Sequence, residues 1–160
     1  MRHVKQLFAA ATIAALLVLV PSTAWAFSTD LAGNVLASGE TTSSSELSDV
    51  QRDLYWAGRS FDTSGISVGG DIIAAGQNIV IGNCSVGGSI RTASQAVRIA
   101  DTSIENNITA AGQTITVSAG TTCAGAYLAG ADIVFAGDAS TLDASGQRVT
   151  LSGHIDGDAT

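Results

Sequence analysis

A unit of 18 residues recurs along most of this chain, and that repeat restricts the possible folds more than any other feature. Corresponding units begin at Asp53, Asp71, Ser89, Asn107 and Gly125. The central unit reads GDIIAAGQNIVI over 70–81, and NITAAGQTITV over 107–117 repeats its pattern. A period of this length is typical of arrays in which each unit buries its apolar side chains only against its neighbours.

Apolar or small side chains alternate with other residues on three short segments of each unit. In the central unit the alternating residues are Ile72 with Ala74, Ile79 with Ile81, and Cys84 with Val86. Alternation with a period of two indicates β-strands. Three strands per 18 residues predict an all-β fold, a triangular single-stranded parallel β-helix (β-solenoid) whose coils are hydrogen-bonded to the coils above and below.

Residues at the same position in successive units form columns, and the apolar columns predict the interior. The predicted core stack is Leu54, Ile72, Ile90 and Ile108, then Phe61, Ile79, Val97, Ile115 and Ile133, then Ile81, Ile99, Val117 and Phe135. The same spacing predicts a further inward column of Val68, Val86, Ile104 and Thr122.

Aligning the 18-residue units shows two further features. A column of small residues, represented by Ala75 and Gly76, predicts a corner where glycine either adopts a positive φ or lets coils approach closely. Beyond the core stack, two residues have to be dropped near Gly137 for Val149 and Leu151 to resume the inward columns.

The chain divides into three predicted parts. Residues 1–26 have the basic start, apolar stretch and Ala24-Trp25-Ala26 motif of a signal peptide, which predicts export, with an uncleaved membrane anchor as the alternative. Residues 27–51 are rich in Ser, Thr and Gly and predict a flexible linker, in which Ser43 and Glu46 have the spacing of a helix-capping box. Residues 52–160 form the repeat domain. Its last coil is incomplete, so the chain could belong to a longer, membrane-tethered protein.

Charge argues against nucleic acid as a partner. Removing Arg2 and Lys5 with the signal from the seven basic residues leaves five against 14 acidic ones, a net charge of −9. No lysine remains, and nucleic-acid binding needs clustered Lys and Arg.

The cysteines are predicted to stay unpaired, although a secreted pair usually forms a disulfide. Cys84 falls in a column with Ile66, Thr102 and Gly120, which places Cys123 two coils above it and three residues to the side. That offset separates the Cα atoms by about 14 Å, and a disulfide spans at most roughly 7 Å. We expect two inert thiols.

No residue pattern indicates catalysis, a metal site or a cofactor. Acyltransferases with 18-residue coils use a histidine base, but the sole histidine outside the signal, His154, is predicted on the surface without partners. Stacked Asp53 and Asp71 could suggest calcium, yet stacked Asp, Ser and Asn commonly satisfy turn backbone groups. Asp101 and Glu105, near Arg98, are the densest charges, and they form no acid and base arrangement for glycoside cleavage.

The segments 53–58, 70–77 and 107–117 resemble the coils of bactofilins, the bacterial polymer-forming cytoskeletal proteins. The resemblance covers about residues 52–160 and implies a right-handed triangular β-helix that polymerises end to end without nucleotide. In that family apolar residues of the terminal coils make the contacts. The matching positions here are Leu54, Trp56 and Phe61 in the first coil and Val149 and Leu151 in the last. The signal sequence likens this chain to exported or membrane-tethered relatives rather than to cytoplasmic members.

These observations favour a non-enzymatic, self-assembling structural solenoid of the bacterial cell envelope. Its main partner is then a second copy of itself, with envelope components as further candidates and the membrane reached only through an uncleaved signal or a C-terminal extension. The alternative hypothesis is an adhesion module that presents a flat face of the β-helix to a glycan or a protein.

Overall fold

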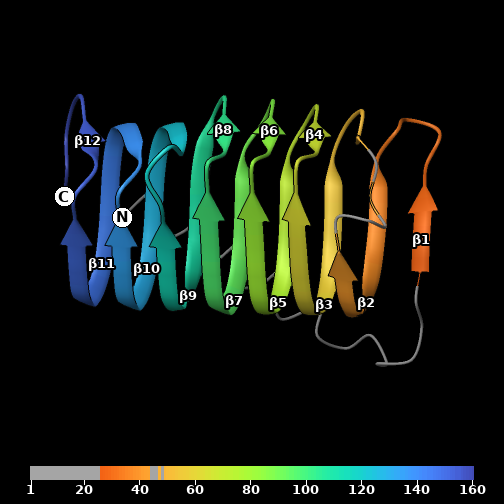
Figure 1. Ribbon diagram of the computed structural model, residues 1–160, viewed down its shortest axis with the longest axis horizontal. Helices are drawn as coiled ribbons and strands as arrows, with labels where there is room; N and C mark the ends of the chain where they lie inside the picture. Colours follow the sequence, from red (N-terminus) through yellow and green to blue (C-terminus); the bar gives the residue numbers. More distant parts are fainter. Residues whose placement is uncertain (1–25, 44–46, 48) are drawn as a thin grey trace, which may run out of the picture.

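A computed structural model describes residues 26–43, 47 and 49–160 of the chain. The described residues are all-β, and the strands lie side by side along one elongated array (Figure 1). The strands are β1 (Ala26–Thr29), β2 (Val35–Ser43), β3 (Leu54–Ser64), β4 (Ser67–Val68), β5 (Ile72–Gly82), β6 (Ser85–Val86), β7 (Ile90–Ala100), β8 (Ser103–Ile104), β9 (Asn107–Val117), β10 (Thr122–Phe135), β11 (Asp138–Leu151) and β12 (His154–Ile155).

One long strand and one short strand make a typical coil. β5 pairs in parallel with β7 at an offset of 18 residues, and β6 pairs in the same way with β8. The pairing of β5 skips Gln77, between Gly76 and Asn78, so the long strand is interrupted at the predicted corner. This arrangement confirms the prediction of a parallel β-solenoid with three straight segments per coil.

The interior is filled by the columns that the repeat defines. Each residue of the predicted core stack is at most 2% exposed. The strand pairs bring Ile72, Ile90 and Ile108 into one column and Ile79, Val97 and Ile115 into another. Because apolar side chains stack on apolar side chains along the whole axis, no coil has to enclose a core of its own.

One predicted column is wrong by a single residue. Thr122 pairs with Ser103 instead of Ile104, so Thr122 is exposed and Cys123 packs against the core. Counted between paired residues, the connection from Val117 to Thr122 is one residue longer than that from Ile99 to Ser103, and Gly120 has a φ of +82° there. In a strand, a shift of one residue exchanges the inward and outward side chains.

The predicted loss of two residues near Gly137 is confirmed. β10 and β11 pair at an offset of 16, with Gly130 opposite Gly146 and Phe135 opposite Leu151. Two residues separate β10 from β11, whereas four separate β9 from β10, and this shorter turn accounts for the change of offset.

The prediction of a flexible linker over 27–51 is wrong for most of that segment. β2 pairs in parallel with β3, from Val35 opposite Leu54 to Ser43 opposite Asp62, so the solenoid begins at Val35 and not at residue 52. The offset is 19 instead of 18, so this coil does not align with the repeat of the following units. Small and hydroxylated residues suit the strand because Ala37 and Thr42, its inward residues, are buried.

The predicted signal peptide lies outside the described residues up to residue 25, and β1 begins at Ala26. Part of the capping-box segment, residues 44–46 and 48, is likewise outside them, and Leu47 and Val50 beside it are buried. Among the described residues there is no helix that could cross a membrane.

Candidate functional site

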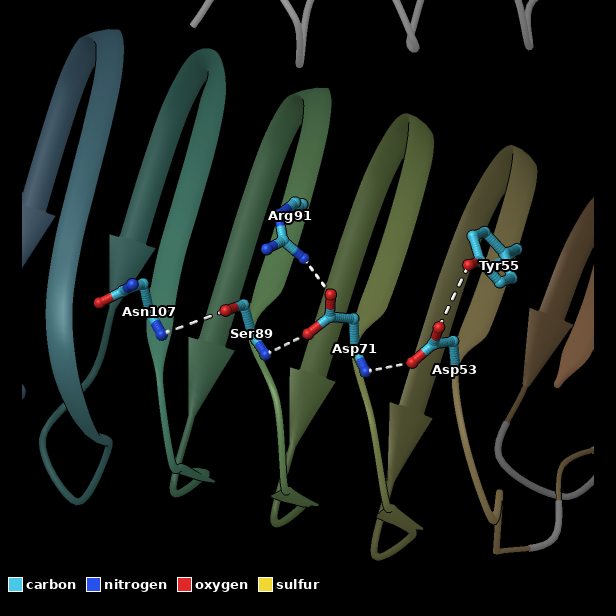
Figure 2. Close-up of polar contacts among 6 residues, drawn as sticks. All are labelled: Asp53, Tyr55, Asp71, Ser89, Arg91 and Asn107. Atoms are coloured by element: carbon cyan, nitrogen blue, oxygen red, sulfur yellow. Dashed lines mark hydrogen bonds and ion pairs between the residues drawn. The ribbon is translucent and has the colours of Figure 1, made fainter. Parts of the chain in front are cut away.

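Polar side chains form a ladder along one edge of the stack, just before the long strand of each coil (Figure 2). Asp53 Oδ1 accepts a hydrogen bond from the backbone N–H of Asp71 at 2.8 Å, and Asp71 Oδ1 accepts one from Ser89 at 2.6 Å. Ser89 Oγ accepts from the N–H of Asn107 at 3.4 Å, and Asn34 Oδ1 begins the series with the N–H of Asp53 at 3.1 Å.

The second oxygen of each ladder aspartate is also engaged. Tyr55 donates its hydroxyl to Asp53 Oδ2 at 3.2 Å, and Arg91 forms an ion pair with Asp71 Oδ2 (Figure 2). Burial, followed by the Asp53 carboxylate, raises the pKa of the Tyr55 phenol. The ladder therefore supports the coil-to-coil turns, as the stacked Asp, Ser and Asn predict.

The other charged residues considered from the sequence stay dispersed. His154 is exposed on β12, and its Nε2 lies 2.8 Å from Asp156 Oδ1 in the same turn. In the part of the chain that the structure describes, Arg98 forms no ion pair with Asp101 or Glu105, and no three His, Cys, Asp or Glu residues gather as a metal site would require.

Both cysteines are free thiols in the structure. The corrected column puts Thr121 above Thr102, so Cys123 lies two residues, not three, to the side of Cys84 and still two coils away. Burial raises the pKa of the Cys84 thiol and raises that of Cys123 to about 11. The reactive thiolate is therefore disfavoured at neutral pH in both residues.

The two ends of the solenoid differ, and they form the candidate functional site. At the N-terminal end, β1 pairs antiparallel with the first part of β2, from Ala26 opposite Ser38 to Thr29 opposite Val35 (Figure 1). The connecting turn is closed by Asp30, whose Oδ1 accepts from the N–H groups of Ala32 and Asn34, each at 2.9 Å.

The sequence-predicted contact residues of this end are wrong. Leu54, Trp56 and Phe61 are at most 1% exposed, because β2 covers the coil to which they belong. Trp56 and Phe61 stack with ring centroids 5.1 Å apart, and Trp56 Nε1 donates to Thr42 Oγ1 of β2 at 2.9 Å. They stabilise the interior and are not available to a second molecule.

Val149 and Leu151, the predicted contacts of the other end, are accessible. They lie opposite the buried Ile133 and Phe135 and so occupy interior columns, but they are 43% and 46% exposed. The segment 145–151 of β11 is exposed throughout, and no described residue pairs with its outer edge. Residues 158–160 cover only the beginning of the last coil, through backbone bonds to Leu142 and Ala144.

The β1 hairpin is the element of this end that the sequence interpretation missed. Asp30, Gly33 and Asn34 are turn formers between two short stretches of strand-like residues, and that pattern could have identified a hairpin. Comparisons of the chain with family models, with curated proteins and with solved structures returned no match.

Proposed function

We propose that this protein is a non-enzymatic, self-assembling structural solenoid, and that a second copy associates with it through the last coil. The observation that carries the proposal is the exposure of Val149 and Leu151. Both side chains occupy columns whose other described members are buried.

The edge of the last coil supports this proposal on physical grounds. An exposed strand edge carries unpaired N–H and C=O groups that readily bond another strand. Covering 145–151 with a strand of a second copy would satisfy those groups and remove two apolar side chains from water. The cell envelope is the proposed location, and its support is the signal-like sequence of residues 1–26 alone.

The test compares a double variant with a single-substitution control, each of which replaces exposed apolar residues by aspartate. Val149→Asp combined with Leu151→Asp puts charges on the interior columns of the last coil, and we expect association to weaken by at least about tenfold. Val134→Asp is the control, because Val134 is also an exposed apolar residue, at 38%, but it points outward from β10. Analytical ultracentrifugation over a concentration series and negative-stain microscopy would measure the assemblies. A parent protein that stays monomeric at high concentration, or a double variant that assembles like the control, would contradict the proposal.

A further inference from the structure

We propose that β1 is a displaceable cap on a second assembly edge, and that the edge beneath it, on β2, accepts the last coil of another copy. The inference rests on the proposed self-assembly and adds its second surface and its regulation. In Figure 1, β1 occupies the place that a further coil would take, beside β2 at the end of the array.

β1 differs from the strands that build the stack. It has four residues, whereas the long strands of the coils have 9 to 14. It runs antiparallel in an otherwise parallel array. Ser28 and Thr29 are exposed, and Leu36, which lies opposite Ser28, is 47% exposed. Backbone bonds and the Asp30 turn therefore hold this part of the cap with little apolar burial, and a two-stranded hairpin is marginal by itself.

A last coil matches the edge that β1 covers. Val35, Ala37 and Thr42 are the inward residues of the first coil, because they lie opposite Leu54, Trp56 and Phe61. In the last coil the same columns end in Leu142, Ala144 and Val149. Stacking one copy on the next in parallel continues each column without a break, which is how every pair of neighbouring coils in the chain already packs.

Charge supports the same arrangement. The column of Thr41 runs through Ser60 to Asp132 and Arg148, so stacking brings Arg148 of one copy above Thr41 of the next. Glu40 adjoins Thr41 and is exposed, with its present partner Arg59 at 3.4 Å. In this register Arg148 lies one residue to the side of Glu40, so stacking places opposite charges near each other at the contact.

Replacing the segments that cover the two edges, β1 and residues 158–160, by a second copy requires little net bonding energy. Stacking in this way releases the β1 pairing of one copy and the bonds that residues 158–160 make to Leu142 and Ala144 of the other. Both sets are strand-type backbone bonds, and the new contact between copies replaces them with bonds of the same type. The gain is the burial of Val149 and Leu151 beneath the first coil, so release of β1 controls whether assembly propagates.

The experiment releases the cap in one variant and locks it in another. Asp30→Ala removes the acceptor that closes the turn and changes no residue of a coil strand, and Asp62→Ala, at an exposed outward position of β3, is the control of equal charge. Ser28→Cys with Leu36→Cys places cysteines on directly opposite residues, whose Cα spacing of about 4.5–5.5 Å suits a disulfide. Hydrogen exchange at 35–38 would verify release of β1, and particle length by negative stain is the readout.

We expect Asp30→Ala to lengthen the assemblies several-fold relative to Asp62→Ala, and the oxidised cysteine pair to prevent lengthening until it is reduced. Adding Val149→Asp and Leu151→Asp to Asp30→Ala should abolish the longer particles. Release of β1 without a change in particle length would overturn the inference. Longer particles in the triple variant would also overturn it, because they would mean that the first coils of two copies bind each other instead of a last coil. Failure of the proposed function would give a different result. The double variant Val149→Asp with Leu151→Asp would then associate as the parent does, even with β1 in place.

Discussion

At the scale of single residues, the interior columns show which substitutions the stack tolerates. Thr63 occupies a column with Ile81 and Ile99, is fully buried, and its hydroxyl has no hydrogen-bond partner. Thr102 is buried to the same extent, but its Oγ1 donates to the carbonyl of Ala100 at 2.8 Å. An unpaired hydroxyl in an apolar interior lowers stability, while a paired one contributes to it.

The same substitution should therefore have opposite effects at these two sites. Thr63→Val removes an unsatisfied hydroxyl with little change of shape, and we expect the free energy of unfolding to rise by about 1 kcal/mol. Thr102→Val should lower it by a similar amount. Urea unfolding monitored by Trp fluorescence would measure both. Destabilisation by both variants would show that the Thr63 hydroxyl has a bonding role.

At the scale of the element, the corner of each coil is set by close approach of the backbone. A Cβ on Gly76 would lie 2.6 Å from the carbonyl oxygen of Gly58 and 2.7 Å from the Trp56 ring, and its φ is not in the left-handed region. Ser94 follows Gly76 in the same column. The preceding coil offers Ser94 the small Ala74 at the position where it offers Gly76 the indole of Trp56. Glycine is thus required at residue 76 because the Gly58 carbonyl and the Trp56 indole both lie too close for a side chain.

Two glycines of β5 provide a direct test of this explanation. We expect Gly76→Ala to destabilise the protein by about 2 kcal/mol or more, because neither the backbone nor the buried indole can move freely. Gly82→Ala should change stability by less than about 1 kcal/mol, since its Cβ would meet nothing closer than 3.8 Å. Thermal unfolding of the two variants is the measurement. Equal effects would mean that the contact with Trp56 is not decisive.

At the scale of the whole molecule, the stack behaves as a one-dimensional array. β5 and β7 each have a long strand on both sides, whereas β11 has one long neighbour, β10, and the short β12. The stability of a strand then depends on the number of coils that hold it. Among the described residues, the interior columns are open to solvent at β11, where Val149 and Leu151 are exposed.

This asymmetry predicts a gradient of protection along the axis. In native-state hydrogen exchange, amides of β5, β7 and β9 should exchange most slowly, and those of β1, β11 and β12 most rapidly. The reason is that a terminal coil can open while it breaks one interface, but a central coil has to break two. A single common rate for all strands would instead indicate that the array opens only by global unfolding.

The sequence by itself determined the period, the parallel solenoid and most of the core. In a stack of this type, the side chain that faces inward at Ile72 is repeated at Ile90 and Ile108, so spacing alone predicts the contacts. Turn residues also predict local roles, and the ladder formed by Asp53 and Asp71 follows that expectation.

Only the tertiary structure decided the offsets and the ends. The offset is 19 between β2 and β3 and 16 between β10 and β11, and such changes arise in turns whose length leaves the apolar alternation unaltered. Burial at an end depends on what lies beyond it. Trp56 and Val149 both have the pattern of terminal apolar residues, but β2 covers the former, and none of the described coils covers the latter.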